Sequence, residues 1–247
     1  MRVDVITLHA VQNYGSVLQA LATQKLLEKH GCEVKIINYI REDVRYKNIL
    51  QARSNGNIIK KIVLYPNVKK WKKVFKGFCN EYLNLTDRSY TTENDFKDYP
   101  LDADMFCTGS DQVWNSKWNQ GIISPLYLSF VPEDKFRFSL AASFGQDKLS
   151  QDEVKATKKY IEKYNCISVR ESSGKKIIEQ QYKYSYAEHI LDPTLMLDDD
   201  EWRKFANNKK TTEDYILIYN LNRSKEFDEY AKKLSRKTGL KLLRICN

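Results

Sequence analysis

A run of polar and aromatic residues able to bind hydroxyl groups follows an apolar stretch near the middle of the 247-residue chain. Its members are Gly109, Ser110, Asp111, Gln112, Trp114 and Asn115. Asp111 could accept a proton from a sugar hydroxyl as a general base, or it could cap the next turn. Gln112 and Asn115 could hydrogen-bond hydroxyl groups of an acceptor. Trp114 could stack on a sugar ring, and a buried tryptophan that fills the protein is an equal alternative.

An arginine directly follows another apolar run, at residues 166–169. Arg170 would lie at the carboxyl end of a strand, where open α/β sheets bind their ligands. Its planar guanidinium suits the oxygens of a phosphate or a carboxylate. The alternative is a surface ion pair between Arg170 and Glu171 or Asp192.

The first polar loop of the chain could also bind an anion. The backbone amides of Gly15 and Ser16 would lie at a helix N-terminus, and the side chain of Asn13 could donate a further hydrogen bond. A glycine for a tight turn and a turn-forming Asn13 are the alternative. The loop has neither GxGxxG nor GK[ST], which argues against NAD and ATP. His9 precedes the loop and could act as acid or base, although a structural role is more common at a strand end.

These segments share one position, because each follows an apolar run that is typical of a β-strand. Ser143, Phe144 and Gly145 follow a further run of this kind. The carboxyl ends of parallel strands meet at one edge of a sheet. We therefore expect the four segments to line a single cleft.

The order of the elements predicts an α/β fold. A strand at 3–8, a helix at 16–30 with Ser16 as its N-cap, and a strand at 33–39 form a βαβ unit, which requires a parallel sheet. The pattern resumes with strands at 103–108, 136–142 and 166–169 and helices at 152–164 and about 172–181. Residues 1–205 are thus predicted to form a Rossmann-like lobe.

Two segments depart from this lobe. Residues 41–98 are basic and aromatic and are predicted to be a mostly helical insertion, with helices at 58–64 and 71–83. Residues 212–247 contain a strand, a helix and a second strand, at 215–221, 224–238 and 240–245. Two strands are few for a parallel sheet, so we expect this segment to be the incomplete start of a second Rossmann-like lobe.

The net charge of +9 is concentrated in one segment. Residues 41–76 contain eleven Lys or Arg and two acids, Glu42 and Asp43, so this segment alone carries +9. Such a patch could face an anionic membrane surface, a pyrophosphate-linked acceptor or nucleic acid, and a solvated helical surface is the simplest interpretation. Nucleic acid is the least favoured partner, because no reader motif accompanies the charge.

The remaining composition favours a cytoplasmic globular protein. The five cysteines form no CxxC pair, and the three histidines have no metal-ligand spacing, so we expect no metal site. The first residues lack the apolar core of a signal peptide, and no stretch approaches 18 apolar residues. A location at the inner face of the cytoplasmic membrane would fit the basic segment.

Three segments taken together resemble the polysaccharide pyruvyl transferase family. They are Asn13-Tyr14-Gly15-Ser16-Val17-Leu18-Gln19, the run from Thr108 to Asn115, and the series Ala142–Gly145, Ile167–Glu171 and Leu191–Thr194. The resemblance implies an enzyme that transfers the enolpyruvyl group of phosphoenolpyruvate to two hydroxyls of a sugar, forming a pyruvate ketal on a surface polysaccharide or its precursor.

The resemblance also implies the form of the site. The fold would have two Rossmann-like lobes, as in two-lobed glycosyltransferases, with the donor in the cleft between them. Arg170 matches an arginine that binds the phosphate or carboxylate of the donor. Phosphoenolpyruvate would be the donor substrate and no cofactor is implied, while the acceptor would be a sugar or a lipid-linked oligosaccharide.

The sequence departs from the family in one motif. Ser-Phe-His-Gly, which ends the second lobe and supplies a histidine to the donor site, does not occur, so we expect a truncated chain that is inactive alone. Two other classes remain as alternatives. One is a nucleotide-sugar glycosyltransferase of similar fold, and the other is a non-catalytic binding module.

Overall fold

Two units of α/β structure make up the chain in the computed structural model, Met1–Asp198 and Asp199–Asn247. The structure describes residues 1–44, 46–206, 213–220 and 224–245. Arg45 of the basic segment and residues 212, 221–223, 246 and 247 of the predicted second lobe lie outside this part. The division falls earlier than the predicted end of the first lobe at residue 205, because the short helix α8 (Asp199–Arg203) belongs to the second unit.

A parallel sheet of seven strands organises the first unit, in the order β3-β2-β1-β4-β5-β6-β7. The strands are β1 (Arg2–Ile6), β2 (Glu33–Tyr39), β3 (Leu85–Tyr90), β4 (Met105–Thr108), β5 (Phe136–Ala142), β6 (Cys166–Val169) and β7 (Ala187–His189). Val5 pairs in register with Ile36 on one side and Cys107 on the other. The predicted Rossmann-like sheet is confirmed, and its direction of growth reverses between β1 and β4.

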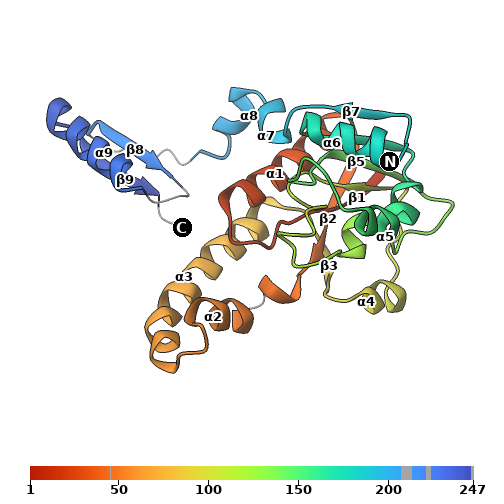
Figure 1. The fold of residues 1–247 in the computed structure, drawn as a ribbon, viewed down its shortest axis with the longest axis horizontal. Helices are drawn as coiled ribbons and strands as arrows, with labels where there is room; N and C mark the ends of the chain where they lie inside the picture. The colour runs from red at the N-terminus through yellow and green to blue at the C-terminus, as the bar shows by residue number, and fades with distance from the viewer. Residues whose placement is uncertain (45, 207–212, 221–223, 246–247) are drawn as a thin grey trace. The chain divides into compact units, whose positions relative to one another are not determined.

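Helices flank this sheet (Figure 1). They are α1 (Tyr14–Lys29), α2 (Tyr46–Ser54), α3 (Ile58–Tyr82), α4 (Glu93–Asp98), α5 (Gln151–Ile161), α6 (Ser172–Lys176) and α7 (Pro193–Met196), with 3-10 turns η1 (Glu42–Val44) and η2 (Ser124–Tyr127) and a π-turn η3 (Ile177–Gln181). Strands buried on both faces need mainly apolar side chains, which explains the apolar residues of β1 and β4. The exception in β1 is the fully buried Asp4, which pairs with Arg2 at 3.3 Å.

Helix α1 begins two residues earlier than predicted. Its N-cap is Asn13, whose side chain accepts hydrogen bonds from the backbone of Gly15 and Ser16, so Ser16 lies inside the helix. Asparagine is as strong an N-cap as serine, and the sequence offers both. The helix ends at Lys29, one residue before its predicted end, and Gly31 follows the cap His30 with a φ of 79° that glycine adopts without strain.

The basic segment differs from its prediction in two ways. The helices expected at 58–64 and 71–83 form one helix, α3, which continues through Pro66. Residues 85–90, predicted to lie in a helical insertion, form β3 at the edge of the sheet. This strand was missed because Thr86 and Tyr90 are its only buried residues, so it shows little of the alternation by which strands are predicted.

The core of the first unit contains the largest aromatic residues of the predicted site. Trp114 lies 5.0 Å from Phe144 and 5.7 Å from Tyr127 between ring centroids, and all three are fully buried. The indole N–H of Trp114 donates to Leu126 O at 3.2 Å, which satisfies its one polar atom. This packing fixes the loop that follows β4 on the core of the lobe.

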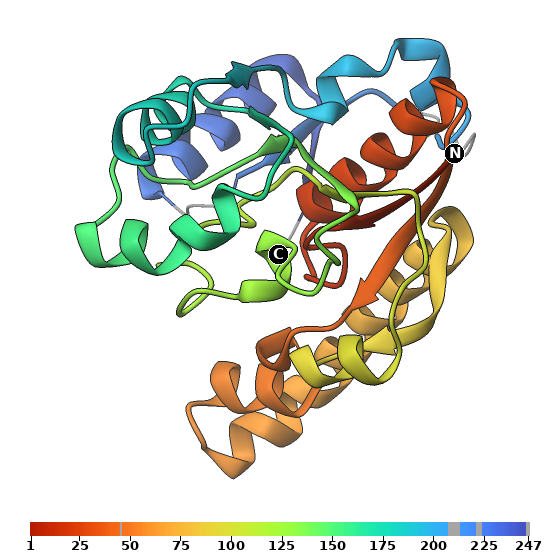
Figure 2. The same cartoon turned by 90° about the vertical axis from the view of Figure 1, so that its right-hand side faces the viewer.

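The second unit contains, among its described residues, two parallel strands, the connecting helix α9 and the short helix α8. Strand β8 (Tyr215–Tyr219) pairs with β9 (Lys241–Ile245), and α9 (Lys225–Thr238) connects them. Ser224 caps α9 through the backbone amide of Phe227, and Gly239 ends it with a φ of 72°. Figure 2 shows both units from a second direction.

Candidate functional site

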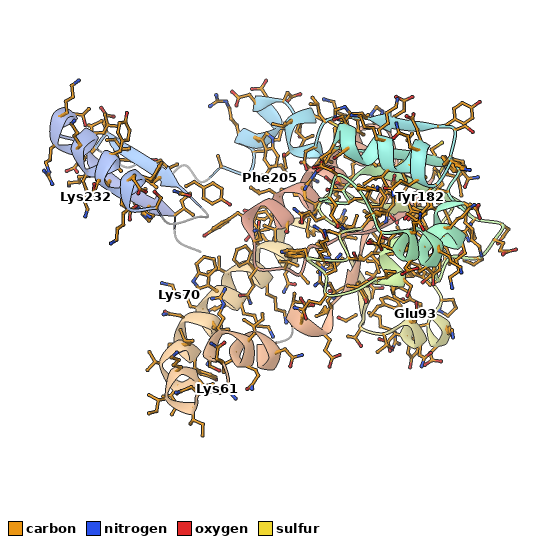
Figure 3. All side chains as sticks on the ribbon, in the orientation of Figure 1. Lys61, Lys70, Glu93, Tyr182, Phe205 and Lys232 are labelled. Atoms are coloured by element: carbon orange, nitrogen blue, oxygen red, sulfur yellow. The ribbon has the colours of Figure 1, made fainter. Side chains whose placement is uncertain are left out.

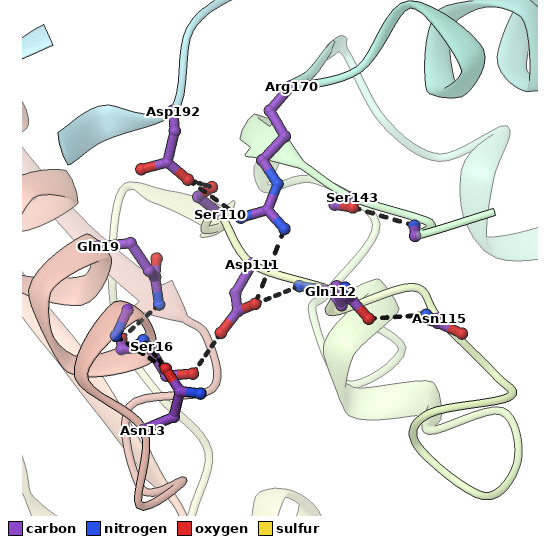
Figure 4. Close-up of polar contacts among 12 residues, drawn as sticks. Asn13, Ser16, Gln19, Ser110, Asp111, Gln112, Asn115, Ser143, Arg170 and Asp192 are labelled. Atoms are coloured by element: carbon purple, nitrogen blue, oxygen red, sulfur yellow. Dashed lines mark hydrogen bonds and ion pairs between the residues drawn. The ribbon is translucent and has the colours of Figure 1, made fainter. Parts of the chain in front are cut away.

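Four segments meet at the carboxyl edge of the sheet, where its strand order reverses between β1 and β4 (Figure 4). The loop after β1 brings Asn13, the first turn of α1 brings Ser16, and the loop after β4 brings Asp111. Arg170 follows β6 directly. Open α/β sheets bind ligands at such a point because the loops diverge there and leave a crevice. The expected convergence of the loops is therefore present.

Arg170 is the centre of this group and contacts three carboxylates. Its Nε donates to Glu171 Oε1 at 2.7 Å and its Nη1 to Asp192 Oδ2 at 3.0 Å. Its Nη2 lies 3.9 Å from Asp111 Oδ1, which is a looser contact. One cation and three carboxylates give the group a formal charge of −2. An anion would therefore have to replace a carboxylate on the guanidinium, and Nη2 is the nitrogen most open to such a ligand.

The charges of the group change the pKa values of its members. Burial lowers the pKa of Arg170, but the hydrogen bond and charge of Glu171, the charge of Asp111 and the hydrogen bond to Asp192 outweigh burial and raise the pKa above its ordinary value. Burial raises the pKa of Asp192, yet hydrogen bonds from Thr194, Ser110 and Arg170 outweigh this and lower it below 3.8. Both side chains are therefore ionised at neutral pH.

A change in acid stability is expected from Asp192. Because its pKa is lowered by folding, its stabilising effect is complete above the unfolded-state value of 3.8 and disappears as the pH falls through the folded-state value. Asp192→Asn should lower the free energy of unfolding at neutral pH and flatten its fall below about pH 4. Urea unfolding of both proteins from neutral to strongly acidic pH measures this, and equal slopes would contradict it.

Asp111 has an unusual backbone and a short contact to the first helix. Its φ is 82°, a conformation that is rare for residues other than glycine and that clusters at functional sites. Its Oδ2 accepts a hydrogen bond from Ser16 Oγ at 2.5 Å, and its Oδ1 accepts one from the backbone amide of Gln112 at 2.8 Å. The carboxylate thus caps the local turn, which is one of the two roles that the sequence left open, and it also holds Ser16 of α1.

The first loop does not present its amides to an anion. Asn13 Oδ1 accepts the hydrogen bonds of Gly15 N at 2.8 Å and Ser16 N at 3.3 Å. The predicted anion cradle of Gly15 and Ser16 is therefore wrong for this structure, because the cap uses the same donors. Tyr14 packs with its ring 5.3 Å from that of Phe75 in α3, so it fixes the loop against the helical insertion.

Trp114 and Phe144 cannot contact a ligand, because both are fully buried in the core. The predicted stacking of Trp114 on a sugar is therefore wrong. Its residue type is equally suited to a binding surface and to a core, and only the packing distinguishes them. Both residues support the site indirectly, since they anchor the loops that follow β4 and β5.

Gln112 and Asn115 pair with each other above Gly145. Asn115 Nδ2 donates to Gln112 Oε1 at 2.8 Å, while Asn115 Oδ1 accepts from the backbone of Trp118 at 3.1 Å. Asn115 is buried, so it holds the loop and is not available to an acceptor as predicted. Gly145 has a φ of 57°, and a side chain there would lie 2.4 Å from Asn115 Nδ2.

Three further predicted residues position the strand ends. Gly109 allows close packing, because a Cβ there would lie 3.0 Å from Thr7 Cβ. Ser110 Oγ donates to Asp192 Oδ2 at 2.9 Å, and Ser143 Oγ donates to Glu171 Oε1 at 2.9 Å. Both serines are fully buried. They orient the carboxylates that hold Arg170.

His9 lies in a separate pocket and not beside Arg170. This pocket has a volume of about 350 Å³ and is lined by the loop after β1 and by residues of β2, β3 and α3, including Asn38, Phe75 and Cys79. Burial lowers the pKa of His9 below 6.5, and hydrogen bonds with Asn38 and Thr7 offset only part of this. The ring is therefore neutral at pH 7, and neither Asp111 nor Arg170 lines the pocket.

Glu171, Asp192 and Gln19 are residues of the site that the sequence did not single out as functional. Glu171 and Asp192 had been considered only as ion-pair partners of Arg170. Glu171 Oε2 is buried and has no hydrogen-bond partner, which is costly for a carboxylate oxygen. Gln19 Nε2 donates to Ser16 O at 2.8 Å and to Thr7 Oγ1 at 2.8 Å. The signal for Gln19 is its helical spacing, since it lies one turn after Ser16 on the same face.

Neither a metal site nor a membrane-spanning helix is found among the described residues. No cluster of three or more His, Cys, Asp or Glu has a geometry suited to a metal ion. In the same part of the chain, no helix combines the length and the apolar character needed to cross a membrane.

A model of one protein family, described as polysaccharide pyruvyl transferase, matches residues 13–247. The chain belongs to this family. The match begins at Asn13, the cap of α1, and covers all the residues of the Arg170 group. Comparisons with curated proteins and with solved structures gave no match. The family supports a transferase function in general, and the resemblance of the three sequence segments is confirmed.

Proposed function

We propose that this member of the pyruvyl transferase family transfers the enolpyruvyl group of phosphoenolpyruvate to two hydroxyls of a sugar. The sugar would belong to a surface polysaccharide or to its lipid-linked precursor, and the product would be a pyruvate ketal. The observation that carries the proposal is the meeting of Arg170 and Asp111 at the reversal point of the sheet in a chain of this family. A cofactor is not required for this chemistry, because the donor itself is activated.

The proposed reaction balances without an oxidant or a reductant. The oxygen of the first hydroxyl adds to C2 of phosphoenolpyruvate, and C3 gains a proton and becomes a methyl group. The oxygen of the second hydroxyl then replaces the phosphate at C2, and the phosphate leaves with the second proton. Asp111 Oδ2 would accept a hydroxyl proton, with Ser16 Oγ as its hydrogen-bond partner at 2.5 Å.

Arg170 would bind the phosphate or the carboxylate of the donor. A guanidinium engages two oxygens of either group, and Nη2 is its least engaged nitrogen. The donor would displace Asp111 from its 3.9 Å contact, which costs little because the contact is long. Glu171 and Asp192 would continue to hold the guanidinium in its plane. This exchange would also release the Asp111 carboxylate for its role as base.

Asp111→Asn separates the proposed roles of binding and proton transfer. Asparagine tolerates a positive φ almost as well as aspartate and can still accept from Ser16, so the fold should persist. Removing one negative charge beside Arg170 should leave phosphoenolpyruvate affinity equal or higher. Any pyruvyl transfer to a polysaccharide acceptor that the unchanged chain supports should fall by about 100-fold or more in the variant, because an amide is no base. Unchanged transfer would exclude Asp111 as the base.

The test of the donor class is a calorimetric titration of the full chain with phosphoenolpyruvate and, separately, with uridine diphosphate. The proposal expects phosphoenolpyruvate to bind more tightly. Tighter binding of uridine diphosphate would favour a nucleotide-sugar glycosyltransferase, which is one of the two alternatives that the sequence leaves open. Binding of neither ligand would favour a non-catalytic module.

A further inference from the structure

The helical insertion exposes a group of branched apolar side chains at its end. Helices α2 and α3 form a hairpin that extends away from the sheet in both views (Figures 1 and 2). The apolar side chains of Ile58, Ile59, Ile62 and Val63, at the start of α3, are between 68% and 74% exposed. Single exposed apolar residues are ordinary, but four within one and a half turns form a patch. We call these four residues the apolar tip.

Lysines accompany the apolar tip along α3, and residues 44–80 contain no acidic residue. The lysines of α3 are Lys60, Lys61, Lys69, Lys70, Lys72, Lys73 and Lys76, of which Lys61 and Lys70 are labelled in Figure 3. All but Lys61 are exposed, and Lys69 lies over the ring of Tyr65 at 5.9 Å. Residues 58–80 of the helix therefore combine an apolar tip with cations only, and the one acid of α3, Glu81, lies in its last turn.

We propose that this hairpin docks on an anionic lipid surface, with the apolar tip entering the boundary between headgroups and acyl chains. A helix that lies at a membrane interface has this composition, with lysines at the level of the anionic headgroups and aliphatic side chains below them. Lysine stems are long enough to keep the charge in the headgroup layer while the helix is partly inserted. The proposal does not depend on which donor the Arg170 group binds.

The charge of the hairpin distinguishes a lipid surface from two other occupants. A second copy of the hairpin would bring two all-basic helices together, and like charges oppose that association. A nucleic acid would satisfy the lysines but would leave Ile58, Ile59, Ile62 and Val63 against water. An anionic bilayer is the partner that satisfies both the charge and the apolar tip.

Sedimentation with vesicles tests the proposal on the full chain. The chain should bind vesicles that contain phosphatidylglycerol. It should bind pure phosphatidylcholine vesicles more weakly, by at least about tenfold. Ile59→Ser with Ile62→Ser removes apolar area and keeps the charge. Lys69→Gln with Lys70→Gln and Lys73→Gln removes charge and keeps the apolar tip. Each set should weaken binding to the anionic vesicles by about tenfold or more.

Two matched control variants alter the same chemistry elsewhere. Leu195→Ser removes an exposed aliphatic side chain outside the hairpin, and Lys155→Gln with Lys158→Gln and Lys159→Gln removes three charges from α5. Both controls should bind vesicles as the unchanged protein does. No binding to anionic vesicles, equal binding to neutral ones, or binding unaffected by the serine substitutions would overturn the proposal. Concentration-dependent dimerisation without vesicle binding would overturn it in favour of an interface between copies.

Discussion

Replacing Arg170 with alanine is expected to reduce the affinity for phosphoenolpyruvate by at least about 100-fold, because the loss of a partly buried charged partner costs several kcal/mol. The substitution removes the one cation of the group and leaves Asp111, Glu171 and Asp192 without a counter-charge. The three carboxylates would then repel the phosphate and carboxylate of the donor. Calorimetric titration of the purified variant measures the loss.

Two further variants make this result specific. Lys163→Ala removes a cation before β6, at the opposite end of the strand that Arg170 follows, where Lys163 pairs with Glu133. It should leave the affinity unchanged. Arg170→Lys keeps the charge but loses the planar fork, so its affinity should lie between those of the unchanged protein and the alanine variant. An alanine variant that binds phosphoenolpyruvate normally would remove Arg170 from the donor site.

The largest effect on stability is expected from Gly145→Ala. The φ of 57° is strained for alanine, and the added Cβ would lie 2.4 Å from Asn115 Nδ2 and 2.9 Å from Gln112 Cδ. Backbone strain and overpacking together should lower the free energy of unfolding by about 2–4 kcal/mol. The pair of Gln112 and Asn115 would have to move, and the loop that carries Asp111 would move with it. Urea unfolding measures the change in free energy.

A second glycine separates the two causes. Gly31 has a φ of 79°, and a Cβ there would meet no atom within 4 Å. Gly31→Ala should therefore cost only the backbone strain, about 1–2 kcal/mol. Equal losses for Gly31→Ala and Gly145→Ala would mean that the contact with Asn115 and Gln112 contributes nothing.

The parallel lobe could be predicted because its signals are local. Apolar runs followed by polar loops marked β1, β4, β5 and β6, and a βαβ pattern requires that their carboxyl ends face one edge. This reasoning placed Arg170 and Asp111 on the same edge although 58 residues separate them in the sequence. The edge strand β3 was missed because three consecutive residues, Asp87, Arg88 and Ser89, are exposed and polar. Edge strands often carry charged residues of this kind.

The roles of individual side chains were harder to predict, because they depend on packing between distant segments. Trp114 and Phe144 lie in polar motifs but fill the core. Asn13 could cap the helix or bind a ligand, and the geometry of α1 decides for the cap. Arg170 could bind an anion or pair with its neighbours, and it contacts three carboxylates, from the segments after β4 and β6 and from the cap of α7. The pairing with Glu171 or Asp192 was one of the two alternatives considered, whereas Asp111, which is distant in the chain, could not be assigned to the same group from spacing.

Amide hydrogen exchange tests directly whether the donor binds at the carboxyl ends of β4, β5 and β6. Exchange is measured on the full chain with and without phosphoenolpyruvate, with inorganic phosphate as a control ligand. We expect slower exchange in residues 108–112, 143–145 and 170–172 when phosphoenolpyruvate is bound. Slower exchange confined to residues 72–80, which line the pocket of His9, would contradict it and would place the ligand beneath α3.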